Sequence, residues 1–157
     1  MQLVEPVFLG QIIQLLDSKA FVQLGNNLLI ASAAAQGIPR SCLATNLHIT
    51  EPDGGIDARS VNAPATVGRL IPQPNSDYQF KAGNSAKSAK EIVTGDIVEK
   101  PRVLEGLRQG HAFVYIASWE RGDKFEDDLF KELVERSLGF TVDREQIVSS
   151  AIIKLFR

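Results

Sequence analysis

The chain has 157 residues, of which 44% are hydrophobic and 23% charged, a length and composition typical of one soluble globular domain with its own core. Seventeen basic and nineteen acidic side chains give a net charge of −2, which excludes a protein that holds nucleic acid through overall positive charge; such a contact needs a local basic patch. The single cysteine, Cys42, excludes an intramolecular disulfide and a cysteine zinc site, and it suits a reducing compartment.

No stretch of the sequence predicts a membrane segment or an export signal. The start, MQLVEPVFLG, lacks a positively charged region and meets a glutamate and a proline early. The longest apolar stretch, residues 28–35, is far too short to span a bilayer. We therefore expect a cytoplasmic protein with no membrane partner.

Two helices are predicted first along the chain. Apolar residues recur at helical spacing over residues 7–16 and 20–35. Asp17 and Ser18 between these segments are typical of a turn and an N-cap, and Gly37 is expected to close the second helix.

Three strands are predicted next. Residues 43–50 alternate between apolar and polar, residues 51–55 (EPDGG) are typical turn sequence, and residues 56–61 form a second strand, so that the pair reads as a hairpin. Residues 62–77 contain three prolines and predict a loop. Residues 78–82, YQFKA, then form the third strand.

The C-terminal half begins with a mixed segment, a flexible loop or a short helix, before a helix over residues 101–109 with proline in its first turn. Residues 111–119, HAFVYIASW, are almost continuously apolar, which predicts a strand buried on both faces, with Trp119 in the core or an interface. Residues 124–139 predict an amphipathic helix that ends at Gly139. Its expected apolar stripe comprises Phe125, Leu129, Leu133 and Val134.

The order of these elements predicts a single α/β domain over residues 1–157, with a mixed central β-sheet flanked by helices. The sequence ending, QIVSSAIIKLFR, stays apolar to its last residues. Such an ending fits either a chain cut from a longer protein or a chain that packs against a neighbour.

Polar side chains interrupt two of the predicted strands. Period-two alternation places Gln79 and Lys81 on one face of the third strand, opposite Tyr78 and Phe80. A lysine on a central strand needs an acid or an anionic ligand nearby. If the second and third strands pair, Asp57 comes close to both polar residues. An acid and an amide oxygen beside a lysine suit a divalent cation and a phosphate.

The GGID turn that ends at Asp57, the loop after it and the pair Gln79-x-Lys81 resemble the PD-(D/E)XK nuclease superfamily. They are most similar to its Mrr-like restriction endonuclease branch, which uses Gln where many relatives have Glu. The helix AFVQLGNNLLIASAA and the strand HAFVYIAS extend the resemblance over residues 19–138. The resemblance implies a restriction-endonuclease-like fold and an endonuclease that hydrolyses double-stranded DNA with Mg²⁺ or Mn²⁺ in bacterial restriction or antiphage defence.

The resemblance also implies residue roles. Asp57 would bind the metal directly, Gln79 would bind it through its side-chain oxygen, and Phe80 would bind it through its backbone carbonyl. Lys81 would be the catalytic lysine. Gln23 matches a helix position, often Glu in that branch, that tunes the metal through water.

Further residues are candidates for supporting roles. Asp53 is either a turn residue or a group that reaches an outer-shell water, and Arg59 either contacts phosphate or is simply exposed. A basic DNA-binding patch is expected from Lys87, Lys90, Arg102 and Arg108, with ordinary solvated side chains as the alternative.

Other interpretations stay open. Asp57 and Lys81 could form a structural ion pair between neighbouring strands. The two amides, Gln23 and Gln79, leave one sure anionic ligand, so an alternative is a weak or inactive relative that binds DNA or protein or acts in oligomerisation. The resemblance further implies a homo-oligomer or attached regulatory domains, with this domain as the N-terminal effector module of a longer protein.

Overall fold

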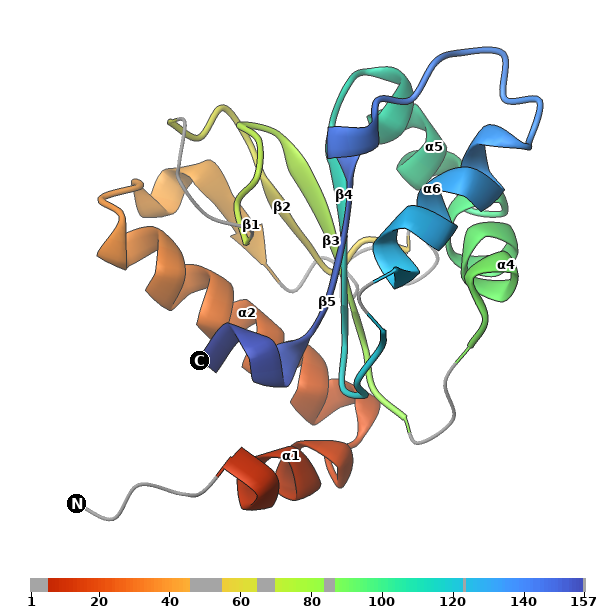
Figure 1. Ribbon diagram of the computed structural model, residues 1–157. Helices are drawn as coiled ribbons and strands as arrows, with labels where there is room; N and C mark the ends of the chain where they lie inside the picture. Colours follow the sequence, from red (N-terminus) through yellow and green to blue (C-terminus); the bar gives the residue numbers. More distant parts are fainter. Residues whose placement is uncertain (1–5, 46–54, 65–69, 84–86, 123, 157) are drawn as a thin grey trace.

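The computed structural model describes residues 6–45, 55–64, 70–83, 87–122 and 124–156. Within them, a mixed five-stranded sheet carries helices on both faces, so the predicted α/β architecture is confirmed (Figure 1). None of the helices in these ranges combines the length and the hydropathy needed to cross a membrane.

The sheet has the strand order β1-β2-β3-β4-β5. Strands β1 (Leu43–Thr45) and β2 (Ala58–Ser60) pair antiparallel, as the predicted hairpin requires, and β2 also pairs antiparallel with β3 (Ser76–Lys81). Strands β4 (Ala112–Ala117) and β5 (Ile147–Ala151) run parallel to β3. All six residues of β4 are buried, which confirms the prediction of a strand covered on both faces.

One face of the sheet is covered by α1 (Pro6–Gln14), α2 (Ser18–Ala35) and the short helix η4 (Ile152–Phe156) (Figure 1). The predicted N-cap is present, because the Asp17 carboxylate accepts a hydrogen bond of 2.8 Å from the Ala20 amide. Gly25 lets α2 approach β3, since a Cβ atom at this position would overlap the Phe80 ring.

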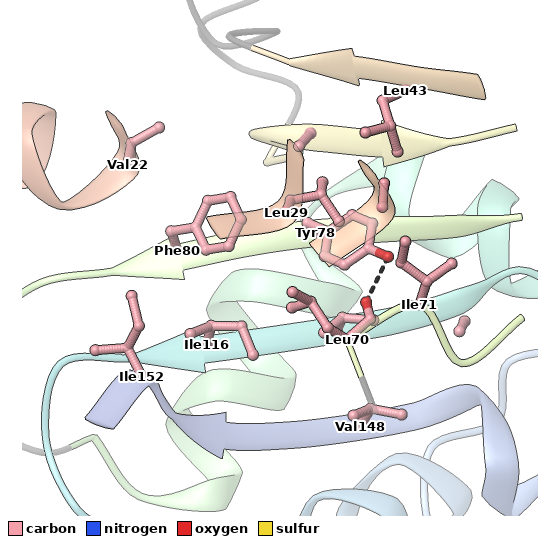
Figure 2. Close-up of a cluster of buried hydrophobic side chains, with 14 of the residues drawn as sticks. Val22, Leu29, Leu43, Leu70, Ile71, Tyr78, Phe80, Ile116, Val148 and Ile152 are labelled. Carbon is pink, nitrogen blue, oxygen red and sulfur yellow. Dashed lines mark hydrogen bonds between the residues drawn. The ribbon is translucent and has the colours of Figure 1, made fainter. Parts of the chain in front are cut away.

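The core on this side is formed by apolar side chains from α2, the sheet and η4. Figure 2 shows Val22 and Leu29 of α2 on the same side of the sheet as Tyr78 and Phe80 of β3. The Tyr78 hydroxyl donates a hydrogen bond of 2.6 Å to the Leu70 carbonyl and so fastens the proline-rich loop to the sheet. Burial raises the pKa of Tyr78, which keeps this donor protonated.

The opposite face is covered by α4 (Ala89–Ile92), η2 (Val93–Val98), α5 (Pro101–Arg108) and α6 (Phe125–Val134). Segment η2 is a π-helical turn that continues directly from α4. Two 3₁₀ turns, η1 (Arg40–Cys42) and η3 (Arg144–Gln146), precede β1 and β5. The largest fully buried side chains on this face are Ile92, Ile97, Leu107, Phe113, Tyr115, Leu129 and Leu133.

Helix α6 corrects two details of the sequence analysis. It ends at Val134, five residues before Gly139, and Val134 is 58% exposed instead of lying on the apolar stripe. The early end lets the chain turn back, so that Leu138 and Phe140 pack against the core beside the buried Leu133. Val134 is rotated by about 100° from Leu133 on the helix, which carries it off the buried face.

The apolar C-terminal run is covered by the domain itself. Residues Ile147–Ala151 pair with β4 as strand β5, and Ile152 and Ile153 are buried in the core shared with α1 and α2. From the sequence, this run fitted a chain cut from a longer protein or one that packs against a neighbour. For the described residues, the apolar side chains of the run are buried inside the fold.

Candidate functional site

A cleft of about 700 Å³ lies at the carboxyl end of β3. Asp57, Gln79 and Lys81 all line it, together with the start of α2, the segment after β3 and the residue before α5. The residues that the sequence analysis selected from two strands therefore meet at one concave surface.

The pairing of β2 with β3 brings Asp57 to this cleft. Ala58 lies opposite Tyr78 in the antiparallel register, so Asp57, one residue earlier, falls opposite Gln79. The Asp57 amide donates to the Tyr78 carbonyl, and the Asp57 Oδ2 atom accepts from the Phe80 amide, both at 2.8 Å. The carboxylate thus accepts from a main-chain donor of β3 just before the first residue of β2, and this contact fixes its position.

Gln79 lies on β3 between Asp57 and Tyr115, which faces it in the parallel register with β4. It is only 3% exposed, and its Oε1 atom is buried without a hydrogen-bond partner among the described residues. The Tyr115 hydroxyl and the Trp119 Nε1 atom are likewise buried without a hydrogen-bond partner among the described residues. All three residues line the cleft, and unpaired buried polar atoms of this kind indicate a place for a polar ligand, an ion or water.

Lys81 contacts an acid that the sequence analysis did not identify. Its Nζ atom lies 3.6 Å from Asp96 Oδ1, and Lys87 Nζ lies 3.8 Å from Asp96 Oδ2. Asp96 is 3% exposed, while both lysines remain partly exposed at the cleft. Burial, and then the negative charge of Asp96, raises the pKa of Tyr115, so the phenol stays protonated beside this group.

Asp96 reaches this position through the π-helical turn η2. The helix α4 before it is fixed by a capping box between Ser88 and Glu91. The wider turn then buries Asp96 among Val93 and Ile97. π-helical turns are frequent at functional sites, because the extra residue redirects a side chain. The one sequence signal was an acid in the otherwise apolar or small segment VTGDIV, residues 93–98.

The cleft has a positive lining. Its lysines are Lys19 of α2, Lys81 of β3, Lys87 before α4 and Lys100 before α5. Asp57 is the one acidic residue among the described lining residues. Positive side chains around a concave surface concentrate the electric field and attract anions such as phosphate groups.

This positive lining differs from the predicted basic patch. Lys87 is part of it, but Lys90 and Arg102 are exposed outside the lining residues, and Arg108 pairs with Glu105 along α5. Lys19 and Lys100 were not identified from the sequence.

Arg59 takes part in a contact within the sheet. Its Nε atom lies 2.6 Å from Asp77 Oδ1, and the other oxygen of this buried carboxylate lies 3.5 Å from His111 Nδ1. Arg59 and Asp77 are opposite each other in the β2–β3 register. Arg59 therefore neutralises a buried acid, a role that the sequence analysis did not include.

Gln23 does not face the cleft. It is exposed on α2, and its Nε2 atom donates a hydrogen bond of 3.0 Å to Asn27 Oδ1. Lys19 and Val22 of the same helix line the cleft instead. The second predicted supporting residue, Asp53, lies outside the described residues.

The donors that remain for a metal are few. No group of three His, Cys, Asp or Glu side chains suited to a metal ion occurs in the described ranges. Asp57 offers a carboxylate, and the buried, unpaired Oε1 atom of Gln79 is next to it in the register. The Phe80 amide already donates to Asp57. It does so on the same side of β3 as the Phe80 carbonyl, which the resemblance assigns to the metal. This set fits Mg²⁺, which commonly takes one or two carboxylates and completes its shell with water and substrate phosphate.

Comparison of the chain with models of protein families, with curated proteins and with solved structures finds no match. The likeness to PD-(D/E)XK nucleases therefore rests on Asp57, Gln79 and Lys81 and on the order of the strands that carry them. Function is inferred from the cleft residues themselves.

Proposed function

We propose that this protein is an endonuclease that hydrolyses phosphodiester bonds of double-stranded DNA with Mg²⁺ or Mn²⁺. The observation that carries the proposal is the meeting of Asp57, Gln79 and Lys81 in one lysine-lined cleft. The resemblance of these residues to Mrr-like enzymes extends the proposal to bacterial restriction or antiphage defence in the cytoplasm. A homo-oligomer or attached domains belong to the proposal, because cutting both strands of a duplex usually needs two active sites.

The lysines support the choice of a polyanionic substrate. Lys19, Lys87 and Lys100 approach the cleft from three different segments, so a phosphate backbone can contact more than one of them. The volume of about 700 Å³ lies within the range of ligand sites. The net charge of −2 does not oppose this, because the positive side chains are concentrated where the substrate binds.

Asp57, Gln79 and Lys81 each have a role in the proposed hydrolysis. Water attacks phosphorus, the ester bond from phosphorus to the leaving oxygen breaks, and that oxygen takes a proton, leaving a phosphate monoester and a hydroxyl. Asp57 and Gln79 would hold the cation, which supplies positive charge at the phosphate and acidifies water. Lys81, held by Asp96 at 3.6 Å, neutralises negative charge that develops on the phosphate oxygens.

A DNA-binding protein without nuclease activity is the second candidate, and two contacts favour it. One oxygen of Asp57 is already used by the Phe80 amide, and the charge of Lys81 is already balanced by Asp96. Both contacts reduce what the cleft can offer to a metal and a reacting phosphate, while leaving Lys19 and Lys100 able to bind a backbone.

Metal dependence separates the two candidates. Supercoiled plasmid is incubated with the purified protein in Mg²⁺, in Mn²⁺ and with chelator, and DNA retention is measured in parallel by fluorescence anisotropy. We expect nicked and linear plasmid with either metal and intact plasmid with chelator. Retention of DNA without cleavage under every metal condition would establish the second candidate instead.

A further inference from the structure

Large apolar side chains are exposed in two places far from the cleft residues Asp57 and Lys81. One place is α1 and the residue that follows it, and the other is the last residue of α6. Among the described residues, the remaining large apolar side chain that is exposed is Val61. Single apolar residues on a surface are ordinary, but neighbouring ones mark interaction sites.

The exposed side chains of α1 form a ridge. Phe8, Ile12 and Leu15 are 58%, 52% and 84% exposed, and their spacing of four and three residues places them on one side of a helix. The Leu15 amide donates a hydrogen bond of 3.1 Å to the Ile12 carbonyl, so the helical path continues to Leu15. Ile13, on another side of α1, is 2% exposed and holds the helix to the core. We refer to Phe8, Ile12 and Leu15 as the α1 ridge.

An apolar hollow of about 330 Å³ lies at the end of α6. Val134, 58% exposed, forms part of its wall, and Arg136 is the one charged residue of the described lining. Arg136 donates a hydrogen bond of 2.7 Å to the Thr94 hydroxyl. We refer to this space as the α6 hollow. Its apolar lining residues are Phe130, Leu133, Val134, Leu138, Phe140 and Val142.

The α1 ridge and the α6 hollow match in shape and in chemistry. The ridge is convex and the hollow concave, and a dry cavity of only about 150 Å³ already holds a benzene ring. The hollow therefore has room for the Phe8 ring and a further apolar side chain. Residues 6–16 contain no charged side chain. This suits an apolar hollow, because a charge buried there without a partner would be costly.

The two surfaces cannot meet within one molecule. Helix α1 packs on one face of the sheet and α6 on the opposite face, with the sheet between them (Figure 1). Each copy of the chain carries one ridge and one hollow. A contact between two different surfaces of identical chains is head-to-tail, and it leads to rings or to open chains of copies.

We propose that a second copy of this chain covers these surfaces, with the α1 ridge of one copy seated in the α6 hollow of the next. Helix α1 leads into α2, whose Ser18 and Lys19 line the cleft, so this contact brings a neighbouring copy near the cleft. The proposal gives the homo-oligomer of the proposed function a surface. It rests on the exposed apolar side chains and does not require cleavage of DNA.

The first test measures the mass of the full chain by analytical ultracentrifugation over a series of protein concentrations. We expect the average mass to rise above that of the monomer as concentration increases. Leu15→Glu and Val134→Glu each place a charge in the contact and are expected to weaken association about tenfold or more. Val61→Glu changes an exposed apolar residue outside both surfaces, so it is the matched control and should associate like the wild type. Circular dichroism checks that each variant is folded.

The second test identifies the surfaces in contact by cross-linking of cysteines. Cys42→Ser removes the single native thiol, and Leu15→Cys or Val134→Cys is then added in separate samples. With a short bismaleimide we expect cross-linked dimers when the two samples are mixed, and far fewer from either sample alone. Val61→Cys in place of Val134→Cys is the control and should give no cross-link above background.

A monomer at every concentration overturns the proposal. So does association that either Leu15→Glu or Val134→Glu leaves unchanged, because each surface is needed. Cross-linking of Leu15→Cys with itself, and not with Val134→Cys, would show that two ridges pair with each other, and it overturns the proposal as well. None of these measurements uses DNA or metal, so their failure and a failure of the nuclease proposal are distinguished.

Discussion

The amine of Lys81 lies 3.6 Å from the carboxylate of Asp96. This lysine of the cleft is therefore anchored by an acid buried in a π-helical turn. The same carboxylate contacts Lys87 at 3.8 Å, on the segment that follows β3. Asp96 therefore contacts two lysines of the cleft.

Asp96→Asn is expected to disturb both stability and function. The amide keeps the shape of the side chain but leaves Lys81 and Lys87 without their balancing charge. Because both lysines are partly exposed, we expect a loss of about 1 to 2 kcal/mol in the free energy of unfolding, less than for a fully buried pair. Urea unfolding measures this, and plasmid cleavage at a temperature where the variant stays folded is expected to fall at least tenfold. The exposed Asp128→Asn on α6 is the control, and equal behaviour of the two variants would contradict the anchoring role.

Gln79 is expected to determine the affinity for the metal. Gln79→Glu adds a second negative charge beside Asp57, and attraction to a dication is strong even at an effective dielectric constant of about 20. This variant should therefore cleave DNA at lower Mg²⁺ concentration, whereas Gln79→Leu, which removes the oxygen, should need more. Titration of Mg²⁺ against cleavage measures both. If Leu is silent and Glu destabilises the protein, Gln79 only fills space beside Tyr115 and the metal site is wrong.

Arg59 is expected to stabilise the fold without taking part in cleavage. Arg59→Met leaves the buried Asp77 with His111 as its remaining ion-pair partner among the described residues, at an expected cost of about 2 to 4 kcal/mol in the free energy of unfolding. The additional change Asp77→Asn removes the unpaired charge and should restore part of that loss, which a double-mutant cycle measures. A stable Arg59→Met variant with weakened DNA binding would reverse the assignment.

Lys19 and Lys100 are expected to contact the DNA backbone. Changing either to Gln should weaken binding to all sequences alike and reduce the slope of log affinity against log salt by about one. Lys90→Gln is the matched control, because Lys90 is exposed but lies outside the lining of the cleft. Fluorescence anisotropy at several salt concentrations provides the slopes. Equal slopes for all three variants would show that the backbone binds elsewhere.

The spacing of apolar residues predicted the helices and strands whose burial is set by neighbouring residues of the sequence. The helical spacing in α2 and the continuous apolar run of β4 require burial on one or both faces, wherever the rest of the chain lies. Alternation in β3 likewise separated Gln79 and Lys81 from Tyr78 and Phe80, because side chains of a strand alternate whatever their neighbours.

Other parts of the site depend on contacts between distant segments and have no local pattern. The rotation of α2 about its axis decides that Lys19 and Val22 face the cleft while Gln23 points to solvent. Asp96 contacts Lys81 from a π-helical turn. The hydrophobic periodicity of the sequence does not predict such a turn.

The most direct measurement of the central claim is the rate of plasmid cleavage by Asp57→Asn in saturating Mg²⁺. Asn keeps an oxygen that can accept the 2.8 Å hydrogen bond from the Phe80 amide, so thermal unfolding should stay close to that of the wild type. The charge that holds the cation is lost, and we expect the cleavage rate to fall at least about a hundredfold, a barrier increase of about 2.7 kcal/mol. Cleavage by folded Asp57→Asn at the wild-type rate, or no metal-dependent cleavage by the wild type, would contradict the claim that this cleft is a nuclease active site.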